Sequence, residues 1–108
     1  MAQTYLSSPV SSVGTSNVNL LTVPVATTGL IIGLCLSNTT SATILATVTL
    51  TRGATSYSLC TNAQIPAGSS ILPIGGDQKV VLMASDVLKV KSSVASSMDA
   101  ILSYVQIQ

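Results

Sequence analysis

The clearest pattern in the sequence is an alternation of hydrophobic and polar positions with a period of two. Between residues 42 and 51, hydrophobic side chains occupy every second position and threonines occupy the positions between them, with Leu45 as the one exception. This alternation is typical of a half-buried β-strand, and β-branched threonine favours a strand over a helix. The hydrophobic set is Ile44, Ala46, Val48 and Leu50, and the polar set is Thr43, Thr47, Thr49 and Thr51.

The same alternation recurs in residues 56–61, 87–91 and 101–107. Residues 30–36 are apolar in both alternating sets except at Gly33, which predicts a central strand covered on both faces. Residues 92–100 contain four serines and are interpreted as a loop or a single turn. Turn-forming segments separate the strands at 37–41, 52–54, 66–68 and 75–77, and a further strand is predicted at 79–83.

These elements predict an all-β protein of about eight short strands, folded as a single antiparallel β-sandwich of jelly-roll-like or immunoglobulin-like type. The length of 108 residues fits one domain, 1–108.

The start of the chain predicts a separate feature. Residues 7–19 are rich in Ser, Gly and Asn, so we expect residues 1–18 to form an extended N-terminal arm held away from the core. Our hypothesis is that this arm is an interaction element that can add a strand to a neighbour. Its candidate contact residues are Ala2, Gln3, Thr4, Tyr5, Leu6, Val10, Val13 and Val18.

The composition is unusual in one respect, because the polar residues of the chain are almost all uncharged. Hydrophobic residues make up 47% of the sequence and charged residues only 6%. A near-neutral surface resists self-association poorly, so we expect copies or partners to cover much of it. The net charge of +1 offers no footprint for nucleic acid, and no basic amphipathic segment suggests a membrane surface.

Two segments bear on location. The apolar run 20–36 is interrupted by Pro24, Gly29 and Gly33, so it predicts two strands and a turn rather than a membrane span. The N-terminus lacks a basic region followed by an apolar stretch, so no signal peptide is expected and folding in the cytoplasm is predicted.

The sequence lacks the residues that most catalysis needs. It contains no histidine and no GxSxG or GxxxxGK pattern, and its three aspartates are predicted to cap turns. Cys35 and Cys60 lack metal-site spacing. Two free, buried thiols are the favoured interpretation, with a disulfide open if their strands are neighbours. We therefore expect no enzyme activity, no cofactor and no metal. Asn38-Thr39-Thr40 matches the N-glycosylation pattern, which we interpret as accidental.

Aromatic anchors are scarce. Tyr5, Tyr57 and Tyr104 are the only aromatic residues, and we expect them at the edge of the core or at contacts between subunits. Sugar or single-stranded nucleic-acid sites need more stacking surface than this.

Residues 65–108 carry a family resemblance. The succession IPAGSSILPIGGDQKVVLMASDVLKVKSS and the terminal DAILSYVQIQ resemble small virion structural proteins of tailed bacteriophages, and LSNTTSATILATVTLTRGATSYSL upstream looks like their central hairpin. The chain departs from them at Ala84-Ser85-Asp86, where such proteins often have a glycine before the aspartate. The resemblance implies no catalytic residues.

What the resemblance implies is an accessory place on the particle. The protein would be located in the virion, assembled in the host cytoplasm, and its partners would be its own copies and the major capsid or neck and tail proteins. The first hypothesis is a capsid decoration or cement protein. A neck, collar or tail component, a receptor- or glycan-binding module and a secreted bacterial adhesin are the alternatives.

Overall fold

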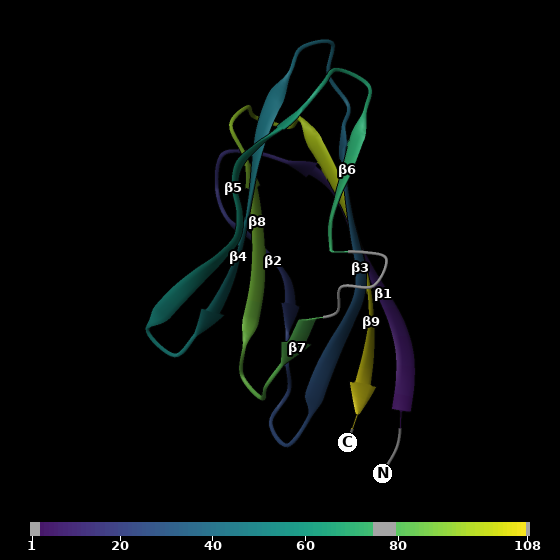
Figure 1. The fold of residues 1–108 in the computed structure, drawn as a ribbon, viewed down its shortest axis with the longest axis vertical. Helices are drawn as coiled ribbons and strands as arrows, with labels where there is room; N and C mark the ends of the chain where they lie inside the picture. Colours follow the sequence, from purple (N-terminus) through teal and green to yellow (C-terminus); the bar gives the residue numbers. More distant parts are fainter. Residues whose placement is uncertain (1–2, 75–79, 108) are drawn as a thin grey trace.

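The computed structural model describes residues 3–74 and 80–107, and within them the chain is all-β, as predicted. Nine strands are formed in these residues, and Figure 1 shows them as two packed layers. The strands are β1 (Gln3–Val13), β2 (Val18–Thr22), β3 (Thr28–Asn38), β4 (Ile44–Arg52), β5 (Thr55–Ile65), β6 (Ser70–Ile74), β7 (Val80–Leu82), β8 (Val87–Ser92) and β9 (Met98–Ile107).

The strand order is that of a jelly roll. One sheet has the order β1-β9-β3-β6, with β7 also paired to β3, and the other has the order β2-β8-β4-β5. All the pairs are antiparallel, and the chain passes from one sheet to the other along two interlocked Greek keys. This confirms the predicted sandwich and selects the jelly roll from the two expected types. Strands β6 and β7 share one neighbour, which accounts for nine strands instead of eight.

The core lies between the sheets and follows the predicted alternation. In β4, Ile44, Ala46 and Val48 are buried, whereas Leu45, Thr47 and Thr49 are partly exposed. In β8, and in β9 as far as Leu102, the buried positions likewise alternate with exposed or partly exposed ones. The largest buried side chains are Ile31, Leu34, Leu36, Ile44, Ile65, Ile74, Leu82, Leu88, Met98 and Leu102. Burying each one stabilises the fold by about 1.5–3 kcal/mol before entropy is counted.

Strand β3 is central, as predicted, but it is covered on one face only. It lies between β9 and the pair β6 and β7. Its inward residues Ile31, Leu34 and Leu36 are buried, whereas Leu30, Ile32 and Cys35 on the other face are only partly buried. The prediction of cover on both faces is therefore wrong for the chain taken alone.

The N-terminal segment is extended, but it does not stand away from the core. Residues 3–13 form β1, which pairs with β9 in continuous register from Gln3↔Ile107 to Val10↔Ala100. The expectation of a detached arm is wrong because main-chain hydrogen bonds to β9 hold the segment at the edge of the larger sheet. Val18 belongs to β2 in the other sheet, and Ala2 lies outside the described residues.

Two smaller predictions are resolved by the strand boundaries, and a third is not tested. Of the loop predicted at residues 92–100, residues 93–97 do form a turn, whereas Ser92 ends β8 and residues 98–100 begin β9. The apolar run 20–36 is divided into β2, a turn and β3, and within the described residues no helix is long and apolar enough to cross a membrane. The turn predicted at residues 75–77 lies outside the described residues.

Cys35 and Cys60 are free, as favoured, but only partly buried. They lie in β3 and β5, which belong to different sheets, so the alternative of a disulfide between neighbouring strands does not apply. Cys35 is partly exposed because it occupies the outward side of β3.

Candidate assembly surface

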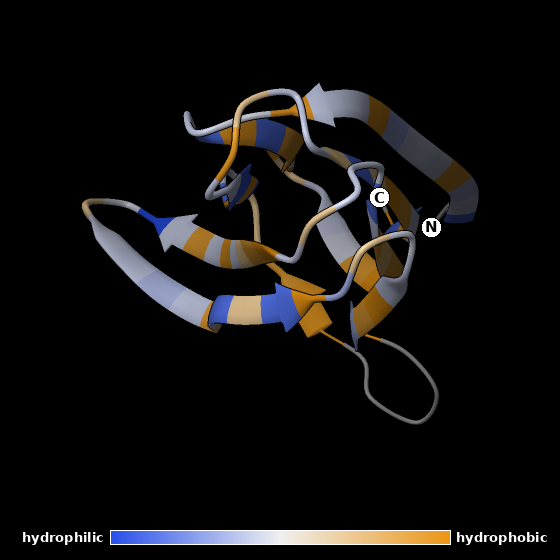
Figure 2. Cartoon of the chain, turned by 90° about the horizontal axis from the view of Figure 1, so that it is seen from above, coloured by the Kyte–Doolittle hydropathy of each residue, from blue (hydrophilic) through white to orange (hydrophobic). Residues whose placement is uncertain are grey.

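The first half of β1 is paired yet poorly buried. Residues 3–7 are all exposed, and Tyr5 has 73% of its surface open to solvent. Val10 packs against the core and Val13 is fully buried, so these two candidate residues serve the fold. Of the predicted contact residues, Gln3, Thr4, Tyr5 and Leu6 lie together on an exposed strand, while Val13 and Val18 do not join them. Figure 2 shows β1 mostly in the pale colours of serine and threonine, with narrow hydrophobic bands.

The outward surface of the larger sheet carries hydrophobic residues on all of its strands. We call these residues the outer sheet face: Tyr5, Leu30, Ile32, Cys35, Leu72, Val81, Ile101 and Val105. Val105 is buried and the others are exposed or partly exposed, and a row of Ser7, Ser103 and Gly33 lies among them. The register aligns them in rows, because Val105 lies opposite both Tyr5 and Leu30, and Leu30 lies opposite Val81. A second row joins Ile101 to Cys35. The sequence analysis did not predict this surface. The pattern that indicated it was in residues 30–36, which are apolar on both faces of the strand.

The outer sheet face contains two shallow hollows with a projection between them. A groove of about 330 Å³ lies over Gly33, with Ile32, Cys35, Leu72 and Ile101 on its walls. A second hollow of about 310 Å³ lies beside β1 and is also lined by Ile101. The side chain of Ile101 is 51% exposed, so it forms a ridge between the hollows. The face therefore has relief that a complementary surface could match.

The outward surface of the smaller sheet is polar. Thr47 lies opposite Lys91, and Thr49 lies opposite Lys89, so hydroxyl and ammonium groups alternate across β4 and β8. A hollow of about 210 Å³ on this side is lined by Thr15, Leu45, Thr47, Asn62, Lys91, Ser92 and Ser93, without an aromatic side chain. The two sides of the sandwich thus differ sharply in chemistry.

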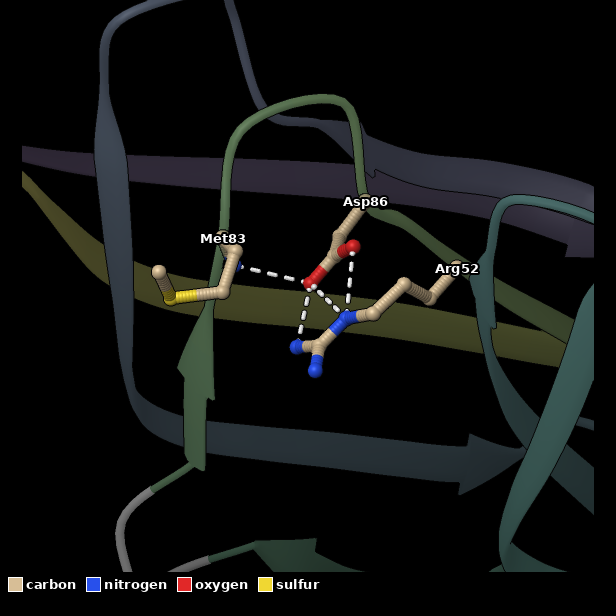
Figure 3. A network of polar contacts seen from close by, with 3 residues as sticks. All are labelled: Arg52, Met83 and Asp86. Carbon is tan, nitrogen blue, oxygen red and sulfur yellow. Dashed lines mark hydrogen bonds and ion pairs between the residues drawn. The ribbon is translucent and has the colours of Figure 1, made fainter.

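An ion pair links the smaller sheet to the turn between β7 and β8 (Figure 3). The Nη2 of Arg52 donates to Oδ2 of Asp86 at 2.7 Å, and Nε donates to both carboxylate oxygens at 3.0 and 3.1 Å. Oδ2 also accepts the N–H of Met83 at 2.8 Å. The Arg52 hydrogen bond, opposed by burial and assisted by the Met83 N–H, holds the pKa of Asp86 below its ordinary value. Asp86 does close a turn, as predicted; its pairing with Arg52 was not foreseen.

Asp99 acts differently from the expected turn cap. Its Oδ1 accepts the N–H of Ser12 at 3.1 Å, across the register shift between β1 and β9. Asp77 lies outside the described residues.

Asn38 is a buried hydrogen-bonding centre at the end of β3. Its Nδ2 donates to the carbonyls of Ala42, Ile65 and Pro66 at 2.7, 2.9 and 3.2 Å. Its Oδ1 accepts the N–H and the hydroxyl of Thr40 at 2.8 and 2.7 Å. The side chain is 3% exposed, so the amide of the glycosylation pattern is inaccessible in the folded chain.

The tyrosines differ in burial, and the contacts between subunits that we expect for them stay a prediction. Tyr104 packs against the core, whereas Tyr5 and Tyr57 are largely exposed.

Burial raises the pKa of the Cys60 thiol, which keeps it protonated near neutral pH. Among the described residues, no group of three metal-ligating side chains is present.

Comparison with known proteins adds information on fold. A scan against protein-family models gives no match, and neither does a search of curated proteins. Among solved structures, a subunit of the disulfide-linked pili of Bacillus endospore appendages is similar, with 11% identity and a TM-score of 0.60 over 99% of this chain and 87% of that one.

A chain of the T13 particle of infectious bursal disease virus is also similar, with 10% identity and a TM-score of 0.59. The match covers 96% of this chain and 30% of the viral chain. A chain from the Gx strain of that virus matches with 17% identity and a TM-score of 0.52, over 98% of this chain and 31% of its own. At such low identities these likenesses establish the fold alone.

Proposed function

We propose that this protein is a non-enzymatic accessory structural protein of a virion, and that it decorates and cements the capsid. The observation that carries the proposal is the contrast between the two sides of the sandwich. A hydrophobic side suits burial in an assembly and a Thr- and Lys-bearing side suits solvent. The resemblance to tailed-phage virion proteins and the fold shared with a chain of an icosahedral virus particle support it.

Attachment to the capsid is proposed to use the free edge of β1. Within the described residues β1 pairs on one side only, and residues 3–8 pair with β9 in unbroken register without a charged side chain. A regular, uncharged edge can accept an additional strand through main-chain hydrogen bonds. The edge of β5 is less suitable, because two register shifts interrupt its pairing with β4.

Deleting residues 3–7 should therefore reduce incorporation into particles at least tenfold while the fold persists. The deleted side chains are exposed, so the core keeps Val10 and Val13. Incorporation would be measured by adding purified protein to particles that lack it and quantifying the bound fraction; circular dichroism and thermal unfolding would report the fold.

The matched control carries residues 3–7 in a different order, which keeps a strand of the same composition. Because main-chain bonds tolerate changes of side chain, this control should bind as the original chain does. Normal incorporation of the truncated protein would reject the β1 edge as the attachment site.

A neck or tail component is the second candidate. The observation that favours it is that the fold spans nearly the whole length of a pilus subunit, so a jelly roll of this size can build a fibre. Decoration requires many copies over the head, and particles without the protein should break at lower temperature. A few copies at one vertex and unchanged particle stability would select the neck or tail instead.

A further inference from the structure

The outer sheet face is hydrophobic like a covered surface, yet within the described residues Val105 is its only buried member. Strand β3 is apolar on both sides, and only its inward residues Ile31, Leu34 and Leu36 are buried by the second sheet. Strands that are hydrophobic on both sides occur where both faces of a sheet are covered. We therefore expect another molecule to pack on the outward residues of β3.

We propose that a second copy of this chain packs against the outer sheet face, sheet on sheet, about a two-fold axis. Such an interface joins one patch to itself, so the patch must hold projections and hollows side by side. Ile101 projects between the groove over Gly33 and the hollow beside β1, and Leu72, 67% exposed, stands at the other wall of that groove. The ridge of each copy enters a hollow of the other.

The near absence of charge on this face favours a second copy of the chain as its partner over a partner that binds through opposite charge. In the described strands of the larger sheet Asp99 is the only charged residue, and Ser12 already donates to it. An uncharged face gives an oppositely charged partner nothing to recognise. Homodimer interfaces are rich in apolar surface, and interface cores are depleted of charge.

The size of the face is also sufficient. Strands β1, β3 and β9 are 11, 11 and 10 residues long, and β6 and β7 add 5 and 3. At about 4.8 Å between strands and about 3.3 Å per residue, they make a flat area of roughly 600 Å². Side-chain relief increases the accessible area above the flat one. The face thus approaches the approximately 800 Å² per partner that a standard stable interface buries.

The test is sedimentation of the purified chain over a concentration series, with Ile101→Asp as the disrupting variant. The original chain should sediment as a dimer of the 10.9 kDa subunit. Ile101→Asp places a carboxylate on the ridge of both copies, so the dissociation constant should rise at least about tenfold.

Two further variants separate the interface from the fold. Gly33→Val fills the groove, and a Cβ at this position meets only the Ile74 carbonyl oxygen, at an ordinary 3.6 Å. This variant should keep the unfolding temperature and weaken the dimer. Val25→Asp is the matched control, since Val25 is an 81% exposed valine in the turn between β2 and β3. It should leave the dimer unchanged.

A monomer at every concentration would overturn the proposal, as would a dimer unaffected by both Ile101→Asp and Gly33→Val. If the chain is monomeric and Ile101→Asp nevertheless abolishes particle binding, the face belongs to the capsid and not to a second copy. The failure of capsid attachment through β1 would be recognised separately, because the protein without residues 3–7 would then bind particles normally, whatever its dissociation constant for the dimer.

Discussion

Replacing Asn38 by alanine should lower the free energy of unfolding by about 3 kcal/mol, because it removes a buried amide that hydrogen-bonds three carbonyls and Thr40. The amide joins the end of β3 to the loop before β4 and to the turn after β5, through the carbonyls of Ala42, Ile65 and Pro66. The Pro66 carbonyl still accepts the Ser69 N–H and the Ala42 carbonyl still accepts the Thr40 hydroxyl. The loss therefore falls mainly on the Ile65 carbonyl and on the Thr40 N–H. Chemical denaturation followed by circular dichroism measures the change.

Two comparisons make this prediction specific to the amide. Asn17→Ala in the exposed loop before β2 should change stability by less than about 0.5 kcal/mol. Asn38→Asp keeps the oxygen that accepts from Thr40 but sets a carboxylate oxygen against three carbonyl oxygens. It should destabilise the fold at neutral pH at least as much as alanine does. A stable aspartate variant would show that the donated hydrogen bonds contribute little.

Replacing Asp86 by alanine should cost about 2 kcal/mol at neutral pH, since the Met83 N–H loses its acceptor and the turn between β7 and β8 loses its tie to β4. The turn also carries Ser85 in a left-handed conformation with φ of 70°, so its closure depends on side-chain support. Asp86→Asn, which preserves an acceptor but not the charge, should cost less.

The contribution of the Asp86 charge should depend on pH in a defined direction. The folded state holds the pKa of Asp86 below its ordinary value of 3.8, so on acidification the unfolded chain takes up this proton first. The stability advantage over Asp86→Asn is then fully present above about pH 5 and falls as the pH drops through 3.8 and below. Unfolding of both proteins at a series of pH values measures it.

A double-mutant cycle assigns the effect to the pair. Because Arg52 is half exposed, part of the attraction is screened, and the coupling between Arg52→Gln and Asp86→Asn should be modest but favourable. An advantage that grew at acid pH, or a coupling of zero, would contradict the role assigned to this pair.

The sequence predicted those elements whose cause is local. β4 was predictable because its hydrophobic and threonine positions alternate, and the loop 93–97 because serines interrupt the pattern. β1 was mistaken for a detached arm because main-chain pairing with β9 holds it, and its serine-rich side chains do not encode that pairing.

The candidate surface was less accessible to sequence reasoning because its parts come together only in the sheet. Leu30, Ile101 and Leu72 are distant in the chain and become neighbours through the order β9-β3-β6. The pair Arg52 and Asp86 is likewise separated by 34 residues. Residues 30–36 are apolar on both faces, and this pattern did indicate the surface. We interpreted it as cover by other strands of the same chain and not by a second molecule.

The measurement that tests the central claim most directly is electron microscopy of intact virions labelled with gold-conjugated antibody against this protein. A decoration role predicts label distributed over the whole head. Label confined to the neck or tail would contradict decoration and favour the second candidate, and particles without label would contradict a place in the virion altogether.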